Sequence, residues 1–414
     1  MTNVLLVDDS KFIQVLVKDV LLQKLNVEIS SSYTLQETKK LLKENHFDVA
    51  IVDINLPDAQ NGEAIDLTIK HGIPVVVLTA GMNQTSKKII TKKDIVEYIT
   101  KSDPETIKYV ATVVERVLKN KQTHVMIVDD SKSSRKLMKT YLEKLNINVV
   151  EATNGQEALE KIEQCKNNLS LIITDNDMDI MNGMELTTKL REKYSKDQLG
   201  IIAVSASGRS LATKFLRHGA NDFVHKPFTF EEFSSRVNLN LELIDLFKKI
   251  KDNANKDFLT GLYNRRYFFE NSPSKLSKAK QKHENLAVAM LDIDHFKKIN
   301  DEYGHDVGDI ALKEMVCILQ KVLTTSSIVA RFGGEEFCLL LEYLELKDLQ
   351  NMMETLRLEF EKNIIKVKDI EFSYTVSIGL YYGLLDSIED MIQIADQCLY
   401  EAKNSGRNKV IIKQ

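Results

Sequence analysis

The chain has 414 residues, of which 43% are hydrophobic and 28% are charged, as in an ordinary soluble protein. This length exceeds one hydrophobic core, because domains usually hold roughly 100–200 residues, so we expect two to four domains. The net charge of −4 offers no general attraction to nucleic acid or to an anionic membrane, so we expect neither as a partner.

An internal repeat organises the first part of the chain. The segment VLLVDDSK returns later as VMIVDDSK, and three further segments return in the same order. Each copy alternates short apolar runs with amphipathic segments, such as 12–25 and 134–145. This order predicts buried parallel strands between helices, that is, a doubly wound five-stranded sheet. We place the two predicted domains at 1–121 and 122–245.

Polar residues follow corresponding strands in the two copies. They are Asp8, Asp9, Asp53, Thr79 and Lys101 in the first copy and Asp129, Asp130, Asp175, Ser205 and Lys226 in the second. The carboxyl ends of such strands open onto one crevice, so these side chains should converge. Clustered carboxylates repel one another and can hold a hard divalent cation such as Mg²⁺ through oxygen ligands.

Both copies resemble receiver domains of two-component response regulators. The resemblance implies that Asp53 and Asp175 accept a phosphoryl group from a sensor histidine kinase or a phosphotransfer protein. It assigns metal binding to Asp8, Asp9, Asp129 and Asp130. It assigns phosphoryl sensing to Thr79, Lys101, Ser205 and Lys226. Both copies keep every one of these residues, so the sequence leaves open which copy is phosphorylated.

A helix is predicted from 231 to 252, with two apolar stripes. One stripe forms a short coiled-coil seam, and the other lies on a different face. The first comprises Leu239, Leu243, Leu246 and Ile250, and the second Val237, Leu241 and Ile244. Either one stripe packs on the second receiver while the other meets a partner helix, or this is the ordinary last helix of a receiver. Residues 246–256 are predicted to be a helical linker.

The pattern changes in the segment 257–414. In chain order we expect a helix opened by 257–266, a strand at 286–291, one polar helix, a hairpin at 328–341, a strand at 372–381, a helix at 390–404 and a strand at 410–412. The motifs DFLTGLYNRR, DIDHFKKIND, GHDVGD, GGEEF and AKNSGRN occur in this order. With them the segment resembles the GGDEF family of diguanylate cyclases, and the whole chain resembles the PleD type of response regulator. The fold implied is α/β, with a central, mostly antiparallel sheet.

The resemblance implies that two GTP molecules are condensed into cyclic di-GMP and two pyrophosphates, with Mg²⁺ or Mn²⁺ as the cofactor. Asp292, the Ile293 carbonyl and Glu335 are expected to hold the metal. Glu335 is also the suspected base for the ribose 3′-hydroxyl, and Glu336 supports the metal side. Because each domain presents one GTP and the product needs two attacks, the resemblance implies a homodimer.

Substrate contacts are expected around these carboxylates. Asn300 and Asp309 would select guanine, because a carboxylate accepts from its N1–H and exocyclic amine, although helix capping is an alternative role for both. The other predicted GTP contacts are Phe296, Lys297, His305, Gly333, Gly334, Lys403 and Arg407. The glycines leave room for a nucleotide, and the cations neutralise its outer phosphates. For His305 a structural hydrogen bond is an equal alternative.

Two other functions stay open. One is a non-catalytic GGDEF domain that only binds nucleotide or partner proteins, and the other is a response regulator that acts purely through contacts of its receivers. The family's RxxD product-inhibition motif would begin nine residues before the hairpin glycines, where Thr324 and Ser327 stand instead of arginine and aspartate. We therefore predict no feedback inhibition through that site.

The four cysteines form no CxxC motif. Cys317 and Cys338 stand in apolar stretches and are predicted to be reduced core residues. No apolar run approaches the roughly 18–20 residues that span a bilayer, and the chain begins without a leader pattern. We therefore expect a cytoplasmic protein without membrane insertion.

Overall fold

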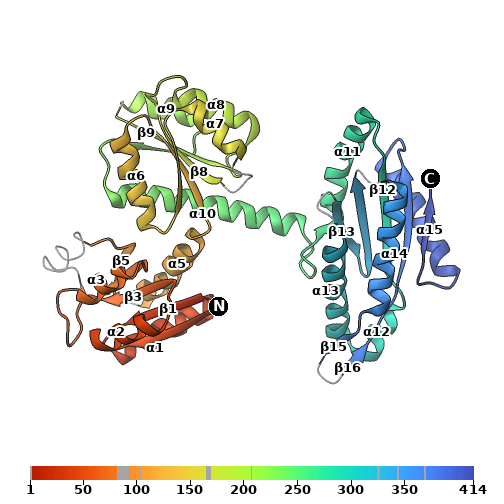
Figure 1. Ribbon diagram of the computed structural model, residues 1–414, viewed down its shortest axis with the longest axis horizontal. Helices are drawn as coiled ribbons and strands as arrows, with labels where there is room; N and C mark the ends of the chain where they lie inside the picture. Colours follow the sequence, from red (N-terminus) through yellow and green to blue (C-terminus); the bar gives the residue numbers. More distant parts are fainter. Residues whose placement is uncertain are drawn as a thin grey trace. The chain divides into compact units, whose positions relative to one another are not determined.

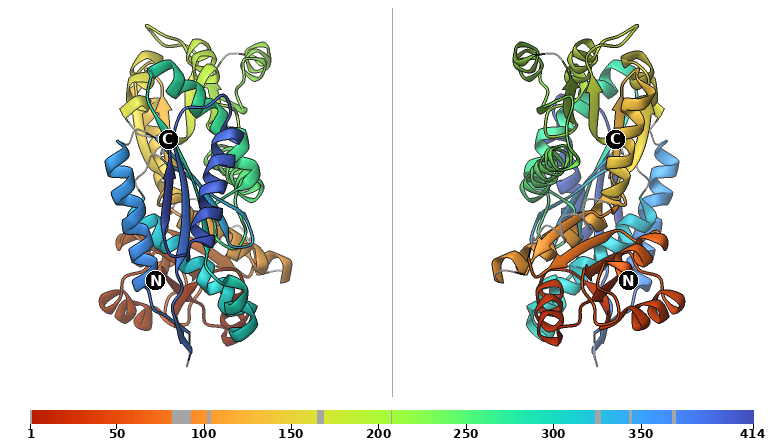
Figure 2. Two further views of the ribbon diagram at one scale, coloured as in Figure 1. Left: turned by 90° about the vertical axis from the view of Figure 1, so that its right-hand side faces the viewer. Right: turned by 90° about the vertical axis from the view of Figure 1, so that its left-hand side faces the viewer.

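The computed structural model describes residues 2–81, 93–101, 104–164, 169–206, 208–323, 327–342, 345–367 and 370–414 (Figures 1 and 2). The chain divides into two compact units, Met1–Lys248 and Lys249–Gln414. Among the described residues, every helix is too short or too polar to cross a membrane.

The first repeat forms a five-stranded parallel sheet, in the order β2-β1-β3-β4-β5. Buried residues of α1 and α5 pack on one face of it, and those of α2 and α3 pack on the other. The elements are β1 (Thr2–Val7), α1 (Lys11–Lys24), β2 (Val27–Ser32), α2 (Leu35–Glu44), β3 (Val49–Asp53), α3 (Glu63–Lys70), β4 (Val75–Thr79), β5 (Glu97–Thr100) and α5 (Pro104–Asn120).

The second repeat forms an equivalent parallel sheet, in the order β10-β9-β8-β6-β7. Its elements are β6 (His124–Val128), α6 (Lys132–Lys144), β7 (Asn148–Ala152), α7 (Gly155–Gln164), β8 (Leu169–Asp175), α8 (Gly183–Lys193), β9 (Gly200–Ser205), α9 (Arg209–Arg217) and β10 (Asp222–His225). The prediction of two doubly wound sheets is confirmed. Its physical basis is visible in β3, β4 and β9, in which every residue is buried.

Helix α10 (Phe230–Asn255) carries both predicted stripes on a single continuous helix. The side chains of Val237, Leu241 and Ile244 are buried, with at most 9% exposed. The other stripe is 42–63% exposed and comprises Leu239, Leu243, Leu246 and Ile250. One stripe therefore packs in the first unit, whereas the coiled-coil seam is open to solvent.

The segment after α10 is built on a six-stranded sheet in the order β11-β13-β14-β12-β17-β18. The three inner pairings are antiparallel and the two outer ones are parallel, so the predicted mostly antiparallel sheet is confirmed. The strands are β11 (Tyr263–Asn264), β12 (Leu286–Ile293), β13 (Ser327–Gly333), β14 (Glu336–Glu342), β17 (Val376–Gly383) and β18 (Val410–Lys413), with a small separate hairpin of β15 (Ile365–Val367) and β16 (Ile370–Phe372).

Helices cover both faces of this sheet (Figure 1). Buried residues of α12, α13 and α14 share one core, and those of α11 and α15 share the other. The helices are α11 (Arg265–Lys282), α12 (Phe296–Tyr303), α13 (His305–Val322), α14 (Leu346–Lys362) and α15 (Ile388–Asn404). Helix α15 lies directly on β17, because a Cβ added at Gly379 would be 2.1 Å from the backbone nitrogen of Leu399. This contact fixes the strand to the helix that carries Lys403.

Two predicted elements are each divided in the structure. The single polar helix is two helices, because Gly304 adopts a φ of +87° and ends α12 before α13 begins. The strand expected at 372–381 is interrupted between β16 and β17. Between these two strands, the Tyr374 hydroxyl donates a hydrogen bond to the carbonyl of Ala311 at 3.0 Å.

The prediction for Cys317 is wrong. Cys338 is fully buried, as expected, but Cys317 is exposed on α13. The buried positions of α13 include Met315, Val316, Ile318 and Leu319, which leaves Cys317 on the solvent side of the helix. Local hydrophobicity gave the wrong answer because the helical period, rather than the apolar run, decides which side chain faces the core.

Candidate active site and phosphorylation sites

In the first sheet, the predicted acidic residues meet at the carboxyl ends of β1 and β3. Carboxylate oxygens of Asp8, Asp9 and Asp53 lie within 4.8 Å of one another. The Lys101 Nζ is 2.6 Å from Asp8 and 2.5 Å from Asp53. Thr79 ends β4 beside them and is buried. The five predicted positions therefore converge in one crevice.

Burial controls the electrostatics of this crevice. It raises the pKa of the Asp8 carboxyl above its ordinary value, and the neighbouring Lys101 offsets only part of that effect. Burial alone would lower the pKa of Lys101, but its hydrogen bonds to Asp53 and Asp8 outweigh burial and raise it. The lysine is thus a firmly held cation among carboxylates. An oxygen-only set of this size also suits Mg²⁺.

The second sheet repeats the arrangement. Oxygens of Asp129, Asp130 and Asp175 again lie within 4.8 Å of one another. The Lys226 Nζ is 2.7 Å from Asp129 and 3.4 Å from Asp175. Ser205 ends β9 and is fully buried. Burial raises the pKa of Asp175, because Lys226 compensates for it only in part.

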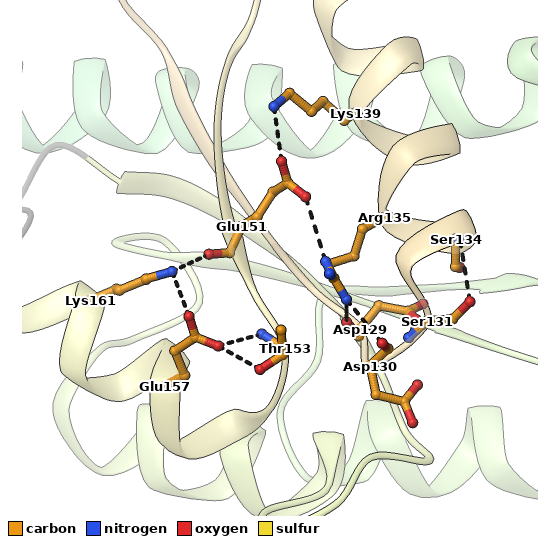
Figure 3. A network of polar contacts seen from close by, with 10 residues as sticks. All are labelled: Asp129, Asp130, Ser131, Ser134, Arg135, Lys139, Glu151, Thr153, Glu157 and Lys161. Carbon is orange, nitrogen blue, oxygen red and sulfur yellow. Dashed lines mark hydrogen bonds and ion pairs between the residues drawn. The ribbon is translucent and has the colours of Figure 1, made fainter.

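Arg135 supports this second acidic loop and was missed by sequence reasoning (Figure 3). Its Nη1 donates to the backbone carbonyls of Asp129 at 2.7 Å and Asp130 at 3.0 Å, and its Nε lies 3.5 Å from Glu151. The first receiver has Gln14 at the matching position, five residues after the acidic pair. The first receiver thus has a neutral amide where the second has a guanidinium. This difference between the two repeats is the sequence signal that could have pointed to Arg135.

Lys139 and Lys161 extend the same network (Figure 3). Lys139 Nζ lies 2.9 Å from the Glu151 carboxylate, and Lys161 Nζ donates to the Glu151 carbonyl at 2.6 Å. Lys161 also pairs with Glu157, which accepts from the backbone and hydroxyl of Thr153. The acidic loop of the second receiver is therefore connected through β7 to helix α7.

In the six-stranded sheet, a second group of acids lies at the end of β12. Asp292 is opposite Glu336 in the antiparallel register of β12 and β14. Its Oδ2 is 2.7 Å from the Lys403 Nζ at the end of α15. Burial, together with the charges of Glu335 and Glu336, raises the pKa of Asp292 to about 6, although Lys403 partly offsets their effect. Such a crowded acidic site favours a bound cation, and its carboxylates and the Ile293 carbonyl would offer oxygen ligands.

Arg331 stabilises the hairpin tip. The sequence analysis did not predict this role for the arginine. Gly333 ends β13 with a φ of +154°, and Gly334 begins the turn with a φ of +52°. Arg331 donates through Nε and Nη2 to the Gly334 carbonyl, at 2.9 and 2.8 Å, and through Nη1 to the Asp257 carboxylate at 3.0 Å. One guanidinium therefore connects the glycine turn to Asp257, two residues after the end of α10.

Asn300 lies on α12 and Asp309 on α13, on either side of the break at Gly304. A Cβ added at Gly308 would be 1.9 Å from the Asn300 Oδ1, so the asparagine side chain lies directly on the glycine. Asp309 is the next residue and is exposed. A side chain at position 308 would therefore displace that of Asn300.

The other predicted contacts differ in exposure. Lys297, His305 and Arg407 are exposed, and Lys403 is half-buried beside Asp292. Phe296 is 8% exposed and packs in the hydrophobic core. Its side chain therefore has a structural role in that core. Thr324 lies outside the described residues.

The comparisons with known proteins agree with this architecture. Residues 4–111 and 125–238 match the family "Response regulator receiver domain", and residues 254–409 match "Diguanylate cyclase, GGDEF domain". Response regulator PleD of Caulobacter vibrioides is 31% identical over 257 residues, which cover 59% of this chain and 57% of PleD. Diguanylate cyclase VdcA of Vibrio cholerae is 32% identical over 270 residues, covering 63% and 76%. The alignment thus spans little more than half of PleD.

A solved structure of a response regulator/GGDEF domain protein matches part of this chain. The crystal structure of a two-component system response regulator/GGDEF domain protein has 35% sequence identity and a TM-score of 0.55, and it covers 59% of this chain and 100% of that one. The two parallel sheets with their acidic crevices are those of receiver domains. This chain belongs to the response regulators that join receiver domains to a GGDEF domain.

Proposed function

We propose that this chain is a diguanylate cyclase whose activity is set by phosphorylation of its receivers. The observation that carries the proposal is the juxtaposition of Asp292 with Glu335, Glu336 and Lys403 beside an open glycine turn. Non-catalytic members of such a family would not need this concentration of acids. The sequence similarity to Response regulator PleD and to Diguanylate cyclase VdcA supports the assignment.

In the proposed reaction, two GTP molecules meet in antiparallel orientation. Each 3′-oxygen forms a bond to the α-phosphorus of the other GTP, and the bond to the β-phosphate breaks and releases pyrophosphate. Glu335 accepts the hydroxyl proton, and Lys403 and Arg407 bind the outer phosphates. Mg²⁺ or Mn²⁺, held by Asp292, Glu335 and the Ile293 carbonyl, would neutralise charge on the phosphates when bound.

Guanine selection is assigned to Asn300 and Asp309. We expect Gly308→Ala to raise the KM for GTP by about tenfold, the cost of roughly one polar contact, because the new Cβ would displace Asn300. Steady-state kinetics with GTP measure the change. Gly208→Ala is the matched control, because nothing lies within 4 Å of a Cβ there. An unchanged KM for Gly308→Ala would contradict this role for Asn300.

The proposed reaction requires a second copy of the chain, since one GGDEF domain holds one GTP and the product needs two. The exposed stripe of α10 supports a parallel homodimer through Leu239, Leu243, Leu246 and Ile250. Dimerisation raises the effective concentration of paired half-sites. The phosphodonor would be a sensor histidine kinase or a phosphotransfer protein that phosphorylates Asp53, Asp175 or both.

The decisive test is incubation of the full chain with GTP and Mg²⁺, followed by chromatography of the products. We expect cyclic di-GMP and pyrophosphate, and no product when EDTA removes the metal. Nucleotide binding without product, even after beryllium fluoride treatment, would favour the non-catalytic GGDEF alternative. Neither binding nor product would favour a regulator that acts through its receivers alone.

Beryllium fluoride mimics a phosphoryl group on aspartate and should increase the rate of product formation. The acceptor that matters is identified by comparing Asp53→Asn with Asp175→Asn, each with and without beryllium fluoride. We expect activation to disappear in at least one variant, while basal activity is retained. Activation that survives in the double variant would rule out phosphorylation at these two aspartates as the control.

Product inhibition through the RxxD position should be weak, because Thr324 and Ser327 replace its charged residues. Titration of cyclic di-GMP into the purified protein should leave the initial rate unchanged below micromolar concentration. Thr324→Arg combined with Ser327→Asp should then create inhibition. Sub-micromolar inhibition of the unmodified chain that maps to these positions would refute the prediction.

A further inference from the structure

We propose that Asp294 and Asn408 are positioning residues that hold Arg407 ready for the outer phosphates of a nucleoside triphosphate. The inference rests on the proposed function and adds a binding device to it. Neither residue touches the expected position of the reacting atoms. Their contacts instead determine the backbone of the loop that carries Arg407.

That loop has an unusual backbone. Gly406, Arg407 and Asn408 are consecutive and all have positive φ, at +114°, +63° and +47°. Glycine adopts this region freely and asparagine tolerates it, but for arginine it is strained. Strain of this kind persists only where the surroundings determine the conformation, and it is common at ligand-binding positions.

Asp294 supplies one of the surrounding contacts. Its side chain is only 4% exposed, and its Oδ2 accepts a hydrogen bond from the Asn408 backbone N–H at 3.0 Å. The hydroxyls of Thr375 and Ser377 donate to the same carboxylate, each at 2.7 Å. Three donors thus hold the carboxylate in one orientation, and one of them is the loop itself.

The position of Asp294 in the chain makes this contact useful. It follows Asp292 by two residues at the end of β12, and its backbone N–H donates to the Thr375 carbonyl at 2.9 Å. The strand end that presents the metal-binding acid therefore also anchors the loop of the phosphate-binding arginine. Both groups keep a fixed separation, which a triphosphate bridging them would require.

Asn408 attaches the other side of the loop to α14. Its Nδ2 donates to Glu361 at 2.8 Å, and its Oδ1 accepts from Arg357 Nη1 at 2.9 Å. The Arg407 N–H donates to the Ala402 carbonyl at 3.0 Å. The loop is thus held by β12, α14 and α15 at once, while the Arg407 side chain stays exposed.

The test uses the full chain and two ligands that cannot react. 3′-Deoxy-GTP lacks the attacking hydroxyl but keeps all three phosphates, and GMP lacks the outer two. Asn408→Ala keeps the amide that Asp294 binds but removes both bonds to α14. We expect it to weaken 3′-deoxy-GTP binding about tenfold, as for the loss of roughly one charge-assisted contact, and to leave GMP binding unchanged.

A double-variant cycle distinguishes positioning from general destabilisation. If Asn408 acts through Arg407, then Asn408→Ala should have little further effect once Arg407→Ala is present. Thr375→Val tests the Asp294 side, and a smaller loss in the same direction is expected. Asn271→Ala, which removes an asparagine bond within α11, is the matched control and should bind both ligands normally. Thermal unfolding verifies that each variant is folded.

The outcomes separate the two proposals. Equal losses for GMP and 3′-deoxy-GTP, additive effects in the cycle, or unchanged binding in Asn408→Ala would each overturn the positioning role. A parent chain that binds GTP and forms cyclic di-GMP would keep the proposed function intact in all three cases. A parent chain that binds no GTP would instead overturn the proposed function.

Discussion

Replacing Glu335 by alanine should reduce cyclic di-GMP formation by at least about 100-fold, since a positioned base or a metal ligand contributes that much or more. The side chain stands at the hairpin tip beside Asp292 and Glu336, where its charge helps to raise the pKa of Asp292. Alanine removes the proposed base and one of the proposed metal ligands together. Product formation from GTP at saturating Mg²⁺ measures the effect.

The fold should not change in this variant, because Glu335 is outside the hydrophobic core and its neighbour Phe337 supplies the buried contact. The melting temperature of Glu335→Ala is therefore expected to match that of the parent. Glu389→Ala, which removes an exposed acid in the first turn of α15, controls for the loss of one negative charge. Wild-type rates for Glu335→Ala would refute its catalytic role.

Disrupting the exposed stripe of α10 should have the second largest effect. Leu246→Glu combined with Ile250→Glu places two like charges opposite one another in the proposed parallel dimer, in a seam that is otherwise apolar. We expect activity at low micromolar protein to fall by roughly tenfold or more, as half-sites separate. The loss should recover as protein concentration rises, because dimerisation obeys mass action.

Sedimentation equilibrium measures the association directly. Both substituted residues are already exposed, at 47% and 63%, so the substitutions should not destabilise the fold of either unit. Leu22→Glu on α1 is the matched control, because that leucine is 57% exposed and lies on a different helix. A concentration-independent loss of activity, or a dimer that persists in the double variant, would contradict this interface.

The receiver sites could be predicted from sequence because strand order alone brings their residues together. Parallel strands with continuous apolar runs leave one place for the polar residues that end them, and Lys101 and Lys226 indeed reach the acids across the sheet. The glycine turn was equally legible, because the hairpin has a clear two-residue tip. For the receiver sites and the glycine turn, the local sequence pattern is enough to predict where the residues lie in the fold.

Other features depended on contacts that local pattern does not contain. Helix α14 is amphipathic but carries no motif, and the break at Gly304 depends on a single positive φ. Arg331 and Asp257 are 74 residues apart in the chain yet form one ion pair. The assignment of Cys317 to the core failed because a run of apolar residues says little about which face of a helix is buried. Such long-range pairings appear only when the chain is folded.

Arg331 binds both Asp257 and the Gly334 carbonyl. These contacts limit where a fragment that contains only the GGDEF domain can begin. Residues before the GGDEF motifs take part too, since the Ala254 carbonyl in the last turn of α10 accepts from Asn264 and Arg266. A fragment that begins at Arg265 would lose Asp257, the partner of Arg331 at the glycine turn, although it would keep every residue of the proposed GTP site. The last turn of α10 thus also belongs to the GGDEF domain, which a fragment beginning after this helix would leave incomplete.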